Sequence, residues 1–389
     1  MNITKRGKTY LITISLKKDS NGKRIREYYT FDPDPTMTAK QAEQAAYKYG
    51  VELENKLKRG GSVKYDTLTF SQFAEMYFKD HAPTLKEYTA AQYKVIYETR
   101  LKPYFGNMRI RNITALDIRQ WLTSQERSTG STTKGKLSDN SKGVYFRTLS
   151  AILGVAVRWD ILDDNPCRRI PTPKNRQSKV KALQKEDFDH LISKIDGYKE
   201  CRAVMLIYLI SLTGIRESEA AGLKWQDIDF EKRVIRIERE VMYIPKIGMR
   251  VTTPKSASSI REVFIPNKLC VKLKEYQARQ ANDISDSGNM YHDEGYVIAQ
   301  IDGSPVHPST IRKWIKNAFE YCDVPYITVH GLRHTYASLL IANGVDPRTA
   351  AAQLGHSSPA ITMNIYANPQ NEAKRRAANL FDDLIEKAE

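Results

Sequence analysis

The C-terminal half of the chain holds two arginines that are well placed to bind a phosphate. Arg333 follows His330 by three positions, so on a helix both side chains would point to the same side. Arg216 follows Thr213-Gly214-Ile215, where the glycine indicates a junction between a loop and a helix. Two guanidinium groups can hold both non-bridging oxygens of a phosphate through paired hydrogen bonds, which lysine cannot do. These residues predict chemistry at a phosphate group.

A further histidine and a tyrosine follow the arginines. His356 ends the run Leu354-Gly355-His356, and Tyr366 lies ten positions after it. Cutting a phosphodiester without a metal requires a nucleophile in line with the phosphorus, and cations that hold the oxygens as charge builds up. A proton must also leave the nucleophile, and another must reach the departing sugar oxygen. The C-terminal half contains residue types that suit these tasks.

The ordered set of motifs resembles the tyrosine recombinases, the integrases of phages and conjugative transposons. Each motif alone is short, but all of them occur in the family's order. The residues that carry the resemblance are Thr213-Gly214-Ile215-Arg216-Glu217-Ser218-Glu219, Lys255, His330-Gly331-Leu332-Arg333-His334, Leu354-Gly355-His356 and Tyr366.

The resemblance implies a site made of a nucleophile and five residues around the phosphate: Tyr366, Arg216, Lys255, His330, Arg333 and His356. Both arginines would bind the scissile phosphate, and His356 would form a hydrogen bond to it. Lys255 would protonate the leaving 5′ oxygen as the general acid, while His330 would assist proton transfer. Tyr366 would attack to give a 3′-phosphotyrosine and a free 5′-hydroxyl. The implied reaction uses no metal and no cofactor.

Tyr366 can be identified as the nucleophile only from the motifs that precede it in the sequence. Tyr366 is one of 22 tyrosines, and most tyrosines are amphipathic core residues. A phenol with a pKa of about 10 is also a poor nucleophile at neutral pH unless cations surround it. The general acid has rivals too, because Lys246 and Lys268 also lie near the predicted hairpin. The run Pro-Lys-Ser-Ala-Ser-Ser-Ile-Arg around Lys255 matches the family pattern and favours that lysine.

The two histidines of the HGLRH run could instead be core residues or a metal-binding pair. A zinc-protease motif needs glutamate after the first histidine, whereas Gly331 occupies that place. We therefore expect no metal site here and interpret His334 as structural. Glu219 is expected to orient an arginine or to support its helix.

The elements that position these residues predict an α+β multidomain protein. Residues 1–65 carry 14 Lys and Arg against 7 Asp and Glu, and contain the β-prone runs 10–14 and 26–31 around the turn 19–22, followed by a helix over 38–57. They predict a small three-stranded sheet with one helix. The resemblance makes this an arm-site DNA-binding domain, and the residues alone also allow a solvated basic face.

Three further regions follow. Residues 66–165 show aromatic residues at helical spacing and predict a helical domain, which the resemblance identifies as the core-binding domain. Residues 166–181 are rich in proline and basic residues and predict an extended linker along DNA. Residues 182–389 form the expected catalytic domain, mainly α with a small antiparallel sheet. Its predicted helices include 203–212, 217–223, 308–321, 331–342 and 347–354, with strands at 234–237 and 262–265.

A last predicted helix spans 372–387 and carries an apolar stripe made of Ala377, Leu380, Phe381, Leu384 and Ile385. The resemblance suggests that this tail helix docks on a neighbouring protomer. Packing on its own domain is the alternative.

The overall composition agrees with a partner that is a polyanion. The formal net charge is +16, from 61 Lys and Arg against 45 Asp and Glu. The four cysteines form no CxxC pair, and no long apolar run predicts a signal peptide or a membrane span. We expect a cytoplasmic, nucleoid-associated bacterial protein without membrane contact. Its expected partners are double-stranded DNA at core and arm sites, a tetramer of its own chain, and an excisionase or a host DNA-bending protein.

Two other functions share part of this pattern. A type IB topoisomerase uses the same chemistry, although the basic N-terminal module argues against it. A non-catalytic, sequence-specific DNA-binding regulator would also contain basic modules and helices, but it would not need Tyr366. A metal-dependent transposase is a weaker alternative, which cleavage in EDTA would exclude.

Overall fold

The structure is a computed structural model that describes residues 1–18, 24–58, 65, 67–125, 137–173, 181–254, 259–356 and 358. The chain divides into two compact units, Met1–Arg176 and Gln177–Glu389. The predicted site residues Lys255 and Tyr366, and the predicted tail helix at 372–387, lie outside the described residues.

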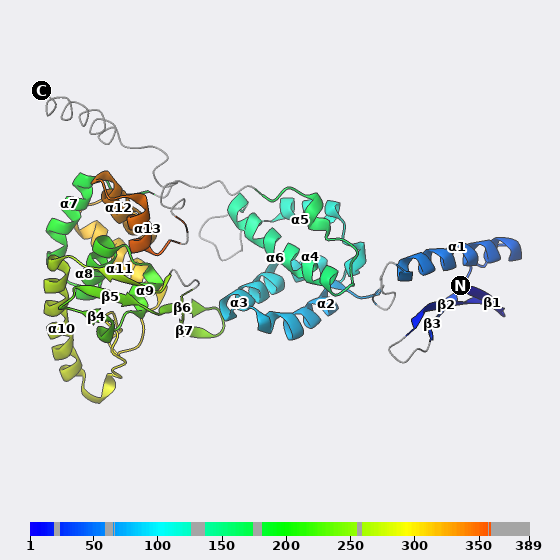
Figure 1. Cartoon of the computed structure of the whole chain (residues 1–389), viewed down its shortest axis with the longest axis horizontal. Helices are drawn as coiled ribbons and strands as arrows, with labels where there is room; N and C mark the ends of the chain where they lie inside the picture. The colour runs from blue at the N-terminus through cyan, green and yellow to red at the C-terminus, as the bar shows by residue number, and fades with distance from the viewer. Residues whose placement is uncertain are drawn as a thin grey trace, which may run out of the picture. The chain divides into compact units, whose positions relative to one another are not determined.

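The first unit begins with the predicted three-stranded sheet and its helix, which are confirmed (Figure 1). The antiparallel sheet has the order β1-β2-β3, and its helix is α1, with the bounds Asn2–Arg6, Thr9–Lys18, Arg24–Phe31 and Ala39–Lys58. Strand alternation places Tyr10, Ile12 and Ile14 in the small cores beneath the helix. The opposite face therefore carries the alternate side chains, among them Thr13, Arg26 and Tyr28.

The rest of the first unit is helical, as predicted. Its α-helices are α2 to α6: Phe70–Met76, Glu87–Ile96, Lys102–Phe105, Ala115–Ser124 and Asp139–Arg158. Short 3-10 or π segments join them: Tyr77–His81, Ala82–Thr84, Tyr97–Leu101, Ile110–Asn112 and Pro166–Arg169. The aromatic residues at helical spacing, among them Phe70, Phe73, Tyr77 and Tyr97, are core residues.

Helix ends in this domain follow local capping chemistry. Thr114 caps α5, where its side chain and that of Asp117 satisfy each other's backbone N–H groups. Ser138 caps α6 in the same position, so this helix begins before the predicted start at Val144. Pro166–Arg169 form a 3-10 turn whose Cys167 is buried in the helical core.

The second unit combines helices with two small antiparallel sheets, whereas one small sheet was predicted for the catalytic domain. Its α-helices are α7 to α13: Lys185–Lys194, Cys201–Thr213, Glu217–Gly222, Asn267–Ser287, Pro308–Tyr321, Val329–Ala342 and Pro347–Leu354. One sheet has the order β4-β5-β8 and the other is the hairpin β6-β7, with the bounds Ile228–Asp229, Val234–Ile237, Arg261–Phe264, Glu240–Ile244 and Gly248–Thr252. Short 3-10 turns lie at Ile195–Gly197, Trp225–Asp227 and Gly288–Met290.

Helix α8 is the centre of this unit. The side chains of α8 itself are apolar on nearly every face, and such a helix is stable only when it is buried. It packs against α10, α11 and α12. Its C-terminal end at Thr213 therefore holds a fixed position inside the unit. Among the described residues, no helix is both long enough and apolar enough to cross a membrane.

Candidate active site

The turn that follows α8 brings Arg216 to the start of α9. Gly214 ends α8 with a φ of +68°, a left-handed conformation that favours glycine. A Cβ at this position would lie 2.6 Å from the side chain of Leu354 and closer still to the ring of Tyr336. Glycine is required here both by the backbone conformation and by the close approach of α12 and α13.

Arg333 is the most deeply buried cation of the site, with a relative exposure of 3%. It lies on α12, which Thr328 caps by accepting a hydrogen bond from the N–H of Gly331. Its two terminal nitrogens donate to the carbonyls of Gly214 and Leu354, both at 2.7 Å. Arg333 thus joins the turn before Arg216 to the end of α13.

Arg216 reaches the same end of α13 from the other side. Its Nη2 donates to the carbonyl of Gly355 at 2.9 Å, and its Nη1 donates to Glu219 at 2.5 Å. The side chain keeps about a third of its surface exposed, at 33%. The two predicted arginines therefore converge on one turn, which carries His356 directly after Gly355.

Glu219 supports this arrangement from a fully buried position, with 1% of its surface exposed. It accepts hydrogen bonds from the backbone and side chain of Arg216 and from Arg261. Burial alone would raise the pKa of Glu219, but the hydrogen bonds and charge of Arg261, with the charge of Arg216, outweigh it and lower the pKa. The carboxylate is therefore charged at neutral pH and orients Arg216, as expected.

Three histidines of the site are kept neutral. Burial and the nearby charges of Arg333 and Arg216 lower the pKa of His330, and they lower that of His356 to about 4. Burial, His330 and Arg333 lower the pKa of His334 to about 4 as well. The rings of His330 and His334 meet edge to face with their centroids 4.6 Å apart. A neutral imidazole can accept a proton and can also donate a hydrogen bond.

Arg333 stays charged in this setting. Burial and the charge of Arg216 lower its pKa to about 9, which leaves the guanidinium protonated at neutral pH. Each terminal nitrogen carries two N–H groups, and one from each is used on a backbone carbonyl. The remaining N–H groups are the donors that a phosphate oxygen could accept from.

Four of the six predicted site residues are thus described, and the structure brings Arg216, Arg333 and His356 to one turn, with His330 within electrostatic reach. Of the lysines that rivalled Lys255, Lys246 is exposed at the turn of the β6-β7 hairpin. Lys268 lies on α10, with its ammonium 5.8 Å from the ring centre of Tyr208.

One residue of the site is missing from the prediction. Arg261, on β8, is nearly buried and binds Glu219 with two nitrogens. In the sequence it is one basic residue among 61, and its partners lie far from it along the chain. Its place in the SIREVF strand pattern indicates burial of neighbours but gives no sign of a carboxylate partner.

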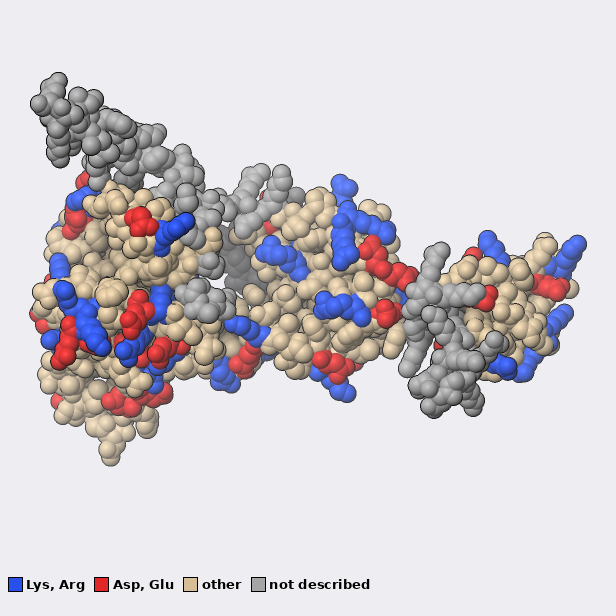
Figure 2. Space-filling view, in the orientation of Figure 1, with Lys and Arg blue, Asp and Glu red and all other residues tan. Residues whose placement is uncertain are grey.

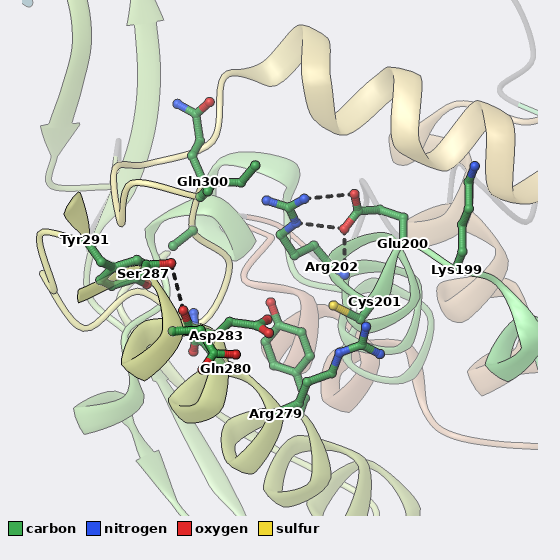
Figure 3. Close-up of a pocket in the computed structure, with 14 residues that line it drawn as sticks. Lys199, Glu200, Cys201, Arg202, Arg279, Gln280, Asp283, Ser287, Tyr291 and Gln300 are labelled. Carbon is green, nitrogen blue, oxygen red and sulfur yellow. Dashed lines mark hydrogen bonds and ion pairs between the residues drawn. The ribbon is translucent and has the colours of Figure 1, made fainter. Parts of the chain in front are cut away.

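A separate cavity of about 400 Å³ lies at the other end of α8 (Figure 3). Arg202 and Glu200 pair across its wall at 2.7 and 2.9 Å, and Arg202 also lies 4.7 Å from the ring centre of Trp314. Helix α8 has 13 residues and rises about 1.5 Å per residue, so the cavity and the Gly214 turn lie about 20 Å apart. This cavity is not part of the candidate active site.

The face of the catalytic unit that Figure 2 shows carries charges of both signs. In the view of Figure 2, basic and acidic side chains are interspersed over the catalytic unit instead of forming one basic field. Among the described residues, Arg216, Arg261 and Arg333 bring positive charge to the candidate site, and they are partly or fully buried. Three buried or partly buried arginines near the single carboxylate of Glu219 attract a phosphate more strongly than exposed surface charges that are each paired with an opposite charge.

The sequence matches two known domain families. The match to the "Phage integrase family" covers residues 181–373, and the match to "Phage integrase, N-terminal SAM-like domain" covers residues 69–124. A tyrosine recombinase XerC-like protein of Caldanaerobacter subterraneus subsp. tengcongensis is 31% identical, over 99% of this chain and 98% of that protein. The ICEBs1 integrase of Bacillus subtilis is 27% identical, over 96% of this chain and 100% of the relative.

A solved structure shares the fold. The integrase of transposon Tn1549, in complex with a circular intermediate DNA, aligns with a TM-score of 0.63 over 80% of this chain and 99% of that one. The two sequences are 20% identical, so this likeness concerns the fold.

Proposed function

Because the chain belongs to the phage integrase family of tyrosine recombinases, we propose that its catalytic unit cuts and rejoins DNA through a covalent link to Tyr366. The protein is a site-specific recombinase of a mobile genetic element, and it acts on double-stranded DNA. What the proposal adds is the nucleophile and the division of the reaction among the predicted residues.

Arg216 and Arg333 would hold the scissile phosphate. One observation carries this assignment: both guanidinium groups are tied to backbone carbonyls of a single turn, Leu354-Gly355, and still have N–H groups to donate. Donors fixed before the substrate arrives need no rearrangement as negative charge builds up on the phosphate oxygens. His356, next in this turn and neutral, would donate a further hydrogen bond.

The proton transfers would involve the remaining residues. The Tyr366 oxygen attacks phosphorus and loses its proton, which the neutral His330 can accept. The bond from phosphorus to the 5′ oxygen breaks, and Lys255 supplies a proton to that oxygen. The products are a 3′-phosphotyrosine and a free 5′-hydroxyl, and attack by a 5′-hydroxyl reverses the sequence to rejoin the strand.

A nicked suicide substrate tests this proposal directly. When the strand is nicked just beyond the cleavage position, the short fragment with the 5′-hydroxyl diffuses away and the covalent complex accumulates. We expect wild-type chain to form an adduct in the presence of EDTA, and peptide mapping to locate it at Tyr366. We expect Tyr366→Phe to form no adduct while it still binds the same DNA.

Tyr326→Phe is the matched control, because Tyr326 is a partly exposed tyrosine of the same unit, at 45% exposure. It should form the adduct at the wild-type rate. An adduct that survives Tyr366→Phe, or no adduct with wild-type chain, would refute the assignment. Strand exchange between two specific sites, without relaxation of unrelated supercoiled plasmid, separates a recombinase from a type IB topoisomerase.

We further propose that DNA is held at two kinds of site. Residues 66–165 would bind the core site, and residues 1–65 would bind arm sites through the open face of the β1-β2-β3 sheet. That face carries Thr13, Arg26 and Tyr28, which offer hydrogen-bond donors and a cation to a DNA groove. Of the predicted linker 166–181, the part that follows the Pro166–Arg169 turn would run along the DNA backbone between domains.

The working assembly would be a tetramer on DNA. The tail helix at 372–387 would dock on a neighbouring protomer, and an excisionase or a host DNA-bending protein would set the direction of recombination. Since both relatives named above are bacterial, we place the reaction in a bacterial cytoplasm, on the nucleoid.

A further inference from the structure

Arg261 connects three segments that each adjoin a predicted catalytic residue. Its Nε donates to the carbonyl of Gln353 at 2.9 Å, and its Nη1 donates to the carbonyl of Ser259 at 3.1 Å. Nη1 and Nη2 also donate to Glu219, at 3.1 and 3.0 Å. Only 7% of the side chain is exposed, and all three of its nitrogens donate to acceptors of the protein itself.

The carboxylate of Glu219 is fully used by its two arginines. Its Oε1 accepts from Nη1 of Arg216 and Nη1 of Arg261, and its Oε2 accepts from the backbone N–H of Arg216 and Nη2 of Arg261. A carboxylate offers about four acceptor positions, so none is left for a second donor from the Arg216 side chain. Nη2 of Arg216 donates instead to the carbonyl of Gly355.

Arg261 also holds the carbonyl of Gly355 in place, which is the second acceptor of the Arg216 side chain. Gly355 has a φ of +66°, and a Cβ on it would lie 2.8 to 2.9 Å from the guanidinium of Arg261. The turn that provides the Gly355 carbonyl therefore rests directly on Arg261, which also binds the carbonyl of Gln353 two residues earlier. Both partners of the Arg216 side chain are held in place by one residue.

We propose that Arg261 is a positioning residue for Arg216. By occupying half of the acceptor positions of Glu219, it prevents Arg216 from closing onto this carboxylate with two parallel bonds. Such a forked pair is the strongest geometry available to an arginine and a carboxylate, and it would turn the guanidinium away from the phosphate. The inference rests on the proposed function, since it assumes that Arg216 binds the scissile phosphate.

The test compares Arg261→Met on two forms of the nicked suicide substrate, under single-turnover conditions with saturating DNA. One form has the natural scissile phosphate and the other has a methylphosphonate, which is neutral because a methyl group replaces one non-bridging oxygen. We expect cleavage of the phosphate to slow by about 10²-fold, the loss expected from a displaced catalytic group. The neutral substrate should slow much less, because Arg216 has less charge to bind there.

Arg216→Lys provides the reference, and should change the ratio of the two rates in the same direction. Arg239→Met is the matched control. It removes another partly buried arginine, 18% exposed, from its pair with the buried Asp227 in the same unit. It should lower the melting temperature and leave the ratio unchanged.

Equal slowing of both substrates by Arg261→Met would overturn the inference and indicate a purely structural role. If that variant does not fold, Arg261→Lys carries the same comparison, because it keeps the charge but lacks the planar fork that binds both oxygens of Glu219. Failure of the wild-type chain to form any adduct would count against the proposed function instead, so the two failures are distinguishable.

Discussion

Arg333 and the histidines around it illustrate how single residues are adapted to this site. The arginine remains charged although it is buried, because two carbonyls accept its hydrogen bonds. The same burial, with the arginine charges, keeps His330, His334 and His356 neutral. Proton acceptors and phosphate-binding cations can therefore lie side by side without repelling each other.

This arrangement makes stability depend on pH. The pKa values of His334 and His356 are about 4 in the folded chain, well below the ordinary value of 6.5, and that of His330 is also lowered. Between pH 4 and pH 6.5 the unfolded chain therefore binds more protons at these histidines than the folded chain does. The free energy of unfolding that they contribute is fully present above pH 6.5 and is lost as the pH falls toward 4. We expect the melting temperature of the full chain to fall between pH 7 and pH 5, where ordinary carboxyl groups hardly titrate.

His334→Asn should make this fall shallower, because one of the shifted groups is gone. His190→Asn replaces an exposed histidine of the same unit and should leave the slope as it is. A slope that His334→Asn does not change would contradict the explanation.

The resemblance predicted the described site residues because each sits in a short motif with its own local spacing. Arg261 ends the run Pro-Lys-Ser-Ala-Ser-Ser-Ile-Arg that favoured Lys255, but the run alone predicts no role for this arginine. Its function depends on Glu219 and on the carbonyls of Ser259 and Gln353, and the two more distant partners lie 42 and 92 positions away. Only the folded chain brings these partners together.

At the scale of elements, the site depends on two sharp turns that end helices. Gly214 and Gly355 both have left-handed backbones, and both provide carbonyls that bind an arginine of the site. Glycine avoids the steric cost that other residues meet in this conformation. The carbonyls at the ends of α8 and α13 are therefore held in fixed positions, where they accept hydrogen bonds from the two arginines.

We expect Gly214→Ala to be more destabilising than a substitution that only strains the backbone. The left-handed conformation alone costs a non-glycine residue about 1–2 kcal/mol. At Gly214 the added Cβ would also collide with Tyr336 and Leu354, so the free energy of unfolding should fall by clearly more than that. Chemical denaturation of the full chain measures the difference.

Gly344→Ala is the matched control, because Gly344 has a φ of +85° and open space around its Cβ position. It should show the backbone cost alone. Equal losses at the two positions would mean that the contacts of Gly214 are not tight in solution.

Elements with strong local signals are the ones that could be predicted. The bounds of α11 and α13 match the prediction at both ends, and in both helices proline is the first residue. The β6-β7 hairpin is absent from the prediction, because its turn uses Lys246 with a φ of +67°, where a hairpin signal would require glycine or asparagine. Helix α10 is also absent, although Leu269, Leu273 and Tyr276 recur at helical spacing.

For the whole molecule, the basic charge of the N-terminal module is the feature with the clearest consequence. Residues 1–65 contain 14 Lys and Arg against 7 Asp and Glu. Deletion of these residues should weaken binding to arm sites more than binding to the core site, if the module reads DNA separately. Competition binding on separate arm and core duplexes, at several salt concentrations, measures this.

Point variants sharpen the comparison. Arg26→Ala removes a cation from the open face of the sheet, whereas Lys48→Ala removes an exposed cation from α1. Arm-site affinity should fall with the first and change little with the second. Equal losses would indicate nonspecific attraction by the whole module.

Finally, the hydrogen bonds of Arg333 and Arg216 have a consequence for how the protein can evolve. Their acceptors at Gly214, Leu354 and Gly355 are peptide carbonyls, which every amino acid possesses. Point mutations at such positions cannot delete the acceptor, and can act only by bending the backbone. The orientation of the two arginines therefore depends on the backbone conformation and not on the side chains at these positions. Nearby side chains can change during evolution without loss of the reaction, as long as the backbone keeps its course.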